Sequence, residues 1–79
     1  MNLNRLKFEE VSFEETKLTN TNFCGSEFIN VSFKNANLYN VNLTEANLEK
    51  ANLSYANLQR TSLYSANLQG ANLEGANLT

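Results

Sequence analysis

The chain has 79 residues, which predicts a single domain spanning residues 1–79, and eight acidic against six basic side chains give a net charge of −2. With no His and one Cys, it cannot assemble a Cys/His nucleophile pair or an ordinary zinc site. No apolar stretch approaches the ~20 residues of a membrane span, and no charged-then-apolar secretory signal is present. We therefore expect a cytoplasmic protein that is not an enzyme, uses no cofactor or small-molecule substrate, and binds neither nucleic acid nor membrane.

A five-residue repeat starts with the first residues and runs through the whole chain. Every fifth position from Leu3 to Leu78 is Leu or Phe, and the position two residues earlier is mostly small, with Ala the most frequent residue. Residues 1–35 contain all five Phe and most of the charge, whereas residues 36–78 consist of near-ideal Ala-Asn-Leu units. One structural unit therefore extends from end to end.

This period matches neither regular element, since a helix returns to one face every 3.6 residues and a strand every 2. Within a unit the two apolar positions alternate as in a strand, and the two residues that follow are mostly polar or Gly. That pattern predicts a short extended segment followed by a turn, which forms a corner of the coil. Because each unit can bury its apolar residues only against copies of itself, the chain should coil into a parallel solenoid with a solid interior.

The C-terminal units carry a family resemblance, for example Ala46-Asn47-Leu48-Glu49-Lys50 and Ala71-Asn72-Leu73-Glu74-Gly75. They resemble the A(D/N)LXX unit of the pentapeptide-repeat family, and the register never slips over the whole chain. The resemblance implies an all-β fold, a right-handed quadrilateral parallel β-helix with twenty residues per coil. Sixteen units then make about four coils and a rod about 19 Å long, given ~4.8 Å between adjacent strands.

With twenty residues per coil, all five Phe fall in residues 1–40, so we expect the N-terminal half to be wider or more distorted. Four inward positions carry hydroxyls, which should each bond a backbone group because burial without a partner is costly; they are Thr16, Thr21, Ser26 and Thr61. Asn dominates the position before the central Leu, where its amide can bond nearby backbone beside a corner. These residues are Asn2, Asn22, Asn37, Asn42, Asn47, Asn52, Asn57, Asn67, Asn72 and Asn77.

Few side chains on the outer walls suggest chemistry. An acidic patch on two successive walls near the N-terminus is interpreted as a solvated, charged end with partner contact as the alternative; it comprises Glu9, Glu10, Glu14 and Glu15. Acid/base catalysis would need these groups to converge in a cleft, which a solenoid without insertions lacks. Lys7, Lys17 and Lys34 lie near enough to pair with the patch.

The remaining outward residues of note are one cysteine and three tyrosines. Cys24 should be a surface thiol without an internal disulfide partner. Tyr39, Tyr55 and Tyr64 fall on three different walls, which argues against a base-stacking platform.

The two ends carry the functional hypothesis. The repeat begins at residue 1 and is still running at Thr79, so its last coils should expose apolar side chains and unpaired backbone. We expect an end-to-end homodimer, most simply two-fold, through Leu63, Leu68, Leu73 and Leu78. The competing interpretation is that the chain is a fragment or one module of a longer repeat protein.

Two function classes are compatible with this pattern. The first is a non-catalytic structural or interaction module with an unidentified protein partner. The second is the DNA-mimicking protection of DNA gyrase that the family resemblance implies for some members. The acidic patch supports mimicry, but a net charge of −2 is far below the one charge per ~1.7 Å of duplex DNA.

Overall fold

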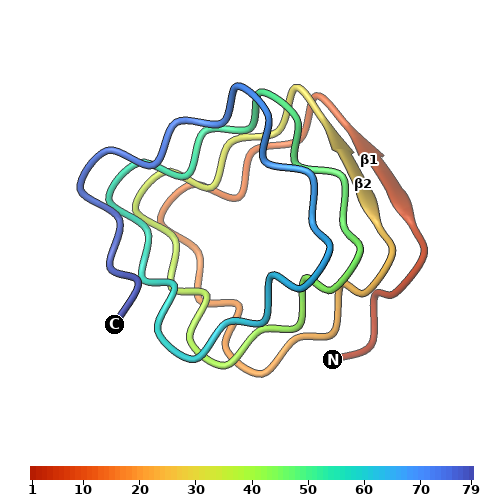
Figure 1. Ribbon diagram of the computed structural model, residues 1–79, viewed down its shortest axis with the longest axis horizontal. Helices are drawn as coiled ribbons and strands as arrows, with labels where there is room; N and C mark the ends of the chain where they lie inside the picture. The colour runs from red at the N-terminus through yellow and green to blue at the C-terminus, as the bar shows by residue number, and fades with distance from the viewer.

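The computed structural model describes all 79 residues and shows the chain winding as a four-sided coil (Figure 1). Each segment pairs in parallel with the segment twenty residues ahead of it, from Asn2 with Asn22 to Asn57 with Asn77. The predicted twenty-residue register is therefore confirmed. Only two segments extend into strands longer than a single bridge, β1 (Lys7–Glu9) and β2 (Glu27–Ile29), which pair with Phe8 opposite Phe28.

Every corner uses the same backbone conformation. The second residue after each fifth-position Leu or Phe from Leu3 to Leu73 has a positive φ, with values between 53° and 74°. At twelve corners the next residue donates its N–H to the carbonyl of the Leu or Phe, as Ala46 does to Leu43 at 3.0 Å. A single positive φ at the third residue of such a bonded turn defines a type II turn. Only three of these corner residues are Gly, so stacking of the coils overrides the usual preference.

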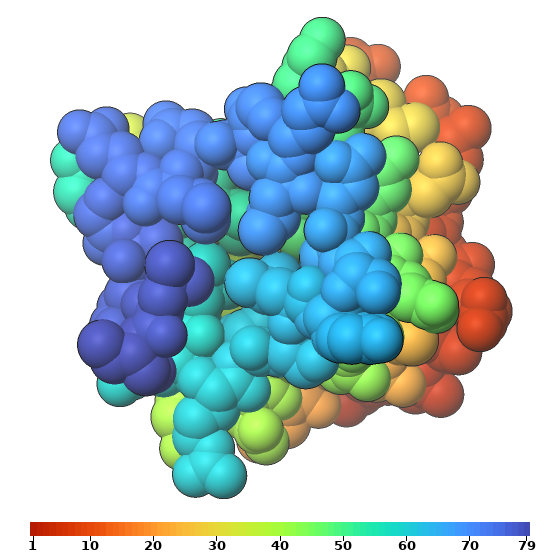
Figure 2. Space-filling model, in the orientation of Figure 1, coloured from red at the N-terminus to blue at the C-terminus, as the bar shows by residue number.

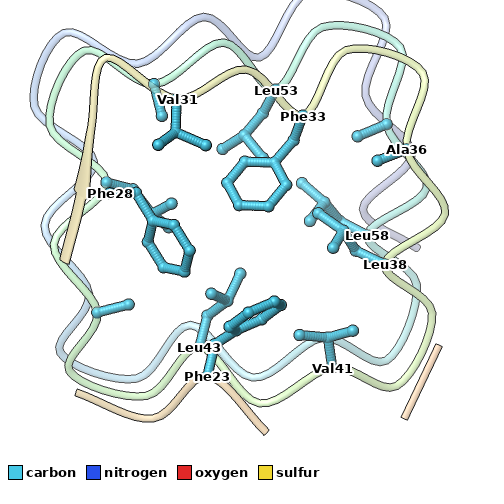
Figure 3. Close-up of a cluster of buried hydrophobic side chains, with 14 residues drawn as sticks. Phe23, Phe28, Val31, Phe33, Ala36, Leu38, Val41, Leu43, Leu53 and Leu58 are labelled. Carbon is cyan, nitrogen blue, oxygen red and sulfur yellow. The ribbon is translucent and has the colours of Figure 1, made fainter. Parts of the chain in front are cut away.

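The core is the column of inward side chains predicted from the repeat. Every Leu, Phe and small residue at an inward position between residues 21 and 58 is at most 3% exposed. Figure 3 shows these side chains converging from all four walls onto the centre of the coil. No central cavity remains for a ligand, and no pocket was found in the structure.

The five Phe rings form one cluster within residues 1–40. Rings twenty residues apart are stacked, with centroids 5.2 Å apart for Phe8 and Phe28 and 5.3 Å for Phe13 and Phe33. Rings on different walls meet edge to face, as Phe23 and Phe28 do at 5.2 Å. The corners after Phe8 and Phe28 lack the turn hydrogen bond, and β1 and β2 run there instead. The corner after Leu3 lacks this bond as well, because the Leu6 N–H donates to the Ser26 hydroxyl instead. The N-terminal half thus departs from the regular turn at three corners.

Three of the four inward hydroxyls bond backbone, as predicted. Thr16 donates to the Phe13 carbonyl at 2.6 Å, and Thr61 donates to the Leu38 carbonyl of the preceding coil at 2.7 Å. Ser26 donates to the Leu3 carbonyl and accepts from the Leu6 N–H. Thr21 makes no side-chain hydrogen bond, so the prediction is wrong for this residue.

Candidate interaction surfaces at the two ends

The outer walls are occupied by the chain's own hydrogen bonding. At each of the ten predicted Asn positions the side-chain Oδ1 accepts the backbone N–H two residues later, at 2.9–3.2 Å. This bond satisfies a corner N–H that makes no hydrogen bond between coils. The role of these Asn residues is therefore to stabilise the corners. No cluster of His, Cys, Asp or Glu suited to a metal ion is present, and no helix has the length and apolarity of a membrane span.

The acidic patch lies on the walls of the first coil, and all four carboxylates are exposed. Its members are not drawn together into a site. Glu9 forms an ion pair with Lys7, with 3.8 Å between Nζ and Oε1, and Glu14 accepts a hydrogen bond from Ser32 at 2.9 Å. Lys17 and Lys34 form no ion pair, so only Lys7 pairs as expected. Exposed pairs of this kind contribute little to stability, and the patch offers no convergent chemistry.

One of the three tyrosines and the cysteine also have local explanations. Tyr55 covers the corner at Gly75, where an added Cβ would lie 2.5 Å from the tyrosine ring. Arg5 and Lys50 cover the other two glycine corners in the same way, since an added Cβ on Gly25 or Gly70 would meet them first. Cys24 is half-buried, and its N–H donates to Asn22.

The C-terminal end, residues 61–79, differs from the walls because its core is open. Leu63, Leu68 and Leu73 are only partly buried, and Leu78 is 57% exposed. Leu58, twenty residues before Leu78 in the same column, is 2% exposed. Figure 2 looks onto this end, where residues 61–79 form the front layer. The four predicted leucines therefore share one face, which is formed by this last coil.

Backbone groups are also unpaired along this face. In the middle of the rod, Leu53 and Tyr55 donate their N–H groups to the next coil, and the carbonyl of Ala51 accepts from it. The equivalent groups of the last coil, the N–H of Leu73 and Gly75 and the carbonyl of Ala71, have no partner. The face thus combines apolar side chains with an open strand edge, which is a template for pairing.

The N-terminal end, residues 1–20, presents a second open face that the site prediction omitted. Met1 is 76% and Leu6 is 44% exposed, while Phe8 and Phe13 are only partly buried although their stacked partners are fully buried. The signal was present in the sequence, because Leu6, Phe8 and Phe13 already occupy inward positions of the first coil. Both ends are therefore candidate interaction surfaces.

A four-sided parallel solenoid with a solid core and a residue of positive φ at each corner defines a class of protein, the right-handed quadrilateral β-helix. The family model described as pentapeptide repeats matches residues 7–44 and 42–79, in eight copies. The chain belongs to this family, as its repeat units indicated. By sequence, no curated protein matches it.

Solved structures share the fold. A pentapeptide repeat protein from the Arabidopsis thaliana thylakoid lumen is 23% identical, with a TM-score of 0.73 over 98% of this chain and 57% of that one. HetL, a pentapeptide repeat protein involved in heterocyst differentiation regulation in the cyanobacterium Nostoc sp. strain PCC 7120, is 28% identical with a TM-score of 0.56, over 99% and 45%. A variant of QnrB1, a plasmid-mediated fluoroquinolone resistance protein, is 20% identical with a TM-score of 0.57, over 95% and 46%. The chain spans about half the length of these proteins.

Proposed function

We propose that this chain is a non-catalytic interaction module that contacts protein partners through its end faces. The single observation that carries the proposal is the contrast in exposure along one core column, from 2% at Leu58 to 57% at Leu78. An apolar surface joined to unpaired strand edges gains free energy when a partner covers it. The walls offer no comparable gain, since their Asn amides are already engaged with the backbone of their own corners.

The absence of catalysis in this proposal rests on the same geometry. General acid/base chemistry needs groups held within reach of a sheltered substrate. The carboxylates here are exposed on a convex surface, with Glu9 and Glu14 on successive walls. The open ends are apolar and carry no titratable side chain at their inward positions.

The alternative, protection of DNA gyrase by DNA mimicry, has one favourable observation, the acidic patch. Mimicry requires a regular, uncompensated line of charge along the rod, whereas Glu9 is paired with Lys7. A supercoiling assay with purified gyrase separates the two functions. We expect no change in supercoiling or in quinolone poisoning at micromolar protein, and an effect lost with Glu14→Gln and Glu15→Gln would favour mimicry instead.

Differential capture tests the end-face proposal. The immobilised chain is compared with Leu78→Lys, which places a charge on the C-terminal face, and with Leu6→Lys, which does so on the N-terminal face. Tyr39→Lys puts the same charge on a side wall, where Tyr39 is 37% exposed. We expect proteins that wild type and Tyr39→Lys retain but that at least one end variant loses. If all four chains retain the same proteins, or if only the wall variant loses them, the proposal is wrong.

A further inference from the structure

The free backbone groups at the two ends of the rod are complementary. On the wall of Leu73 the C-terminal edge offers two donors, the N–H groups of Leu73 and Gly75, and one acceptor, the carbonyl of Ala71. On the wall of Phe13 the N-terminal edge offers the reverse, the carbonyls of Ser12 and Glu14 and the N–H of Ser12. If Phe13 of a second copy lies over Leu73, every one of these groups finds a partner.

This pairing repeats a geometry that the molecule already contains. Leu53 donates to Asn72, Tyr55 donates to Glu74, and Asn72 donates to Ala51, at 2.8, 2.8 and 3.0 Å. All coil–coil bonds in the rod have N–O distances of 2.7–3.3 Å. A second copy can therefore stack on the first as one more coil, with the same twenty-residue offset and the same backbone conformation.

The side chains of the two ends also fit each other in that register. Leu and Phe columns continue across the joint, with Phe8 of the second copy over Leu68. At the alternate inward positions the large residues of the N-terminal end meet small residues of the C-terminal end, Leu6 over Ala66 and Val11 over Ala71. Since overpacking would destabilise the contact, this large-over-small pairing allows two exposed apolar layers to close without a collision of bulky groups.

We propose that the chain assembles with copies of itself, head to tail, so that the C-terminal face of one copy is covered by the N-terminal face of the next and the solenoid continues across the joint. This inference rests on the proposed function and names the partner of the end faces. Viewed along the rod, the molecule measures 26 by 22 Å (Figure 1). If each face is covered over most of this cross-section, the buried area is of the order of the ~1,000 Å² expected of a specific interface.

A head-to-tail contact uses different surfaces on the two copies, so it leaves one free face of each kind and generates open rods. A two-fold dimer through the last coil would instead bring two donor-rich edges together. The head-to-tail register places Glu14 of one copy over Glu74 of the other, both exposed. Their repulsion is screened by salt, so association should strengthen as salt rises and should strengthen further in Glu74→Lys.

Sedimentation of variants blocked at one end tests the arrangement. Leu6→Lys blocks the N-terminal face and Leu78→Lys blocks the C-terminal face, while Tyr39→Lys serves as the side-wall control. We expect the average mass of wild type and of Tyr39→Lys to rise with concentration beyond that of a dimer. Each end variant should stay monomeric alone, and their equimolar mixture should form a heterodimer and nothing larger, because only one joint can form. Circular dichroism melting verifies that each variant is folded.

Two outcomes would overturn the inference. A wild-type mass that stays that of a monomer up to millimolar concentration excludes self-assembly, and the capture experiment then decides the proposed function on its own. Self-association of Leu6→Lys without heterodimer formation in the mixture identifies the two-fold contact through the last coil instead.

Discussion

Ser26 provides the sharpest test of how this fold is stabilised. Its side chain is fully buried, and its hydroxyl donates to the Leu3 carbonyl at 2.9 Å and accepts the Leu6 N–H at 3.1 Å. At twelve other corners the two equivalent backbone groups bond each other directly. The hydroxyl of the second coil therefore completes a corner of the first coil. The substitution Ser26→Ala removes this bridge.

The expected cost follows from the two groups left behind. An unsatisfied backbone group costs about 1–3 kcal/mol, and the lower end applies because this corner belongs to the partly exposed first coil, so the total is about 2 kcal/mol. For a domain of this size that corresponds to a fall in Tm of about 8–16 °C. The repeat pattern alone predicts the opposite sign, because Ala is the most frequent residue at this position and burying a hydroxyl is unfavourable.

Thermal and urea unfolding of wild type, Ser26→Ala and Ser62→Ala would measure this effect. Ser62 is exposed, and its hydroxyl forms only a solvent-exposed bond with the hydroxyl of half-buried Thr44, so Ser62→Ala should change the free energy of unfolding by less than about 0.5 kcal/mol. The assays use a dilute sample, which separates folding from association. An unchanged or higher Tm for Ser26→Ala would show that the corner closes on itself and that the bridge does not stabilise it.

Three further sets of substitutions test the core, the corners and the walls. Leu53→Ala, at a fully buried site, should cost about 2–5 kcal/mol, whereas Leu78→Ala should cost less than about 1 kcal/mol because its side chain is 57% exposed; equal losses by urea unfolding would contradict the packing argument. Gly75→Ala should cost about 1–3 kcal/mol, since the new Cβ would lie 2.5 Å from the Tyr55 ring and φ is +68°. Part of that loss should be recovered when Tyr55→Ala is added, and a strictly additive double mutant would rule out the clash. Asn52→Ala should cost about 1 kcal/mol, because Asn52 Oδ1 accepts from both the N–H and the hydroxyl of Ser54; a Tm equal to that of wild type would show that water replaces these bonds.

Most of the fold could be predicted from the sequence because the same five-residue unit repeats along the whole chain. A five-residue period with two alternating apolar positions specifies which side chains point inward, and the predicted residues between 21 and 58 form the core. The twenty-residue coil came from the family resemblance, since no local property of the repeat decides whether three, four or five units close a turn. The Asn ranks were predicted to bond nearby backbone because an amide that precedes a corner has an N–H within its reach.

The candidate site was predicted only in part. The four leucines of the last coil were expected to be exposed, and Leu78 is. The opposite end was omitted from the site, although Leu6 and Met1 follow from the same reasoning about an unfinished repeat. The acidic patch was predicted to lie on two successive walls; its members do not converge there, and Lys7 and Ser32 engage two of them.

The sequence by itself determined the inward and outward faces and the family, because a strict period repeats the same local choice along the whole chain. Only the tertiary structure decided how Ser26 spans two coils and which backbone donors and acceptors stay free at each end. These depend on residues about twenty positions apart, whose contacts arise only when the coils stack. Which end carries mainly free donors and which carries mainly free acceptors follows from the parallel pairing of the coils, and neither composition nor a motif specifies it.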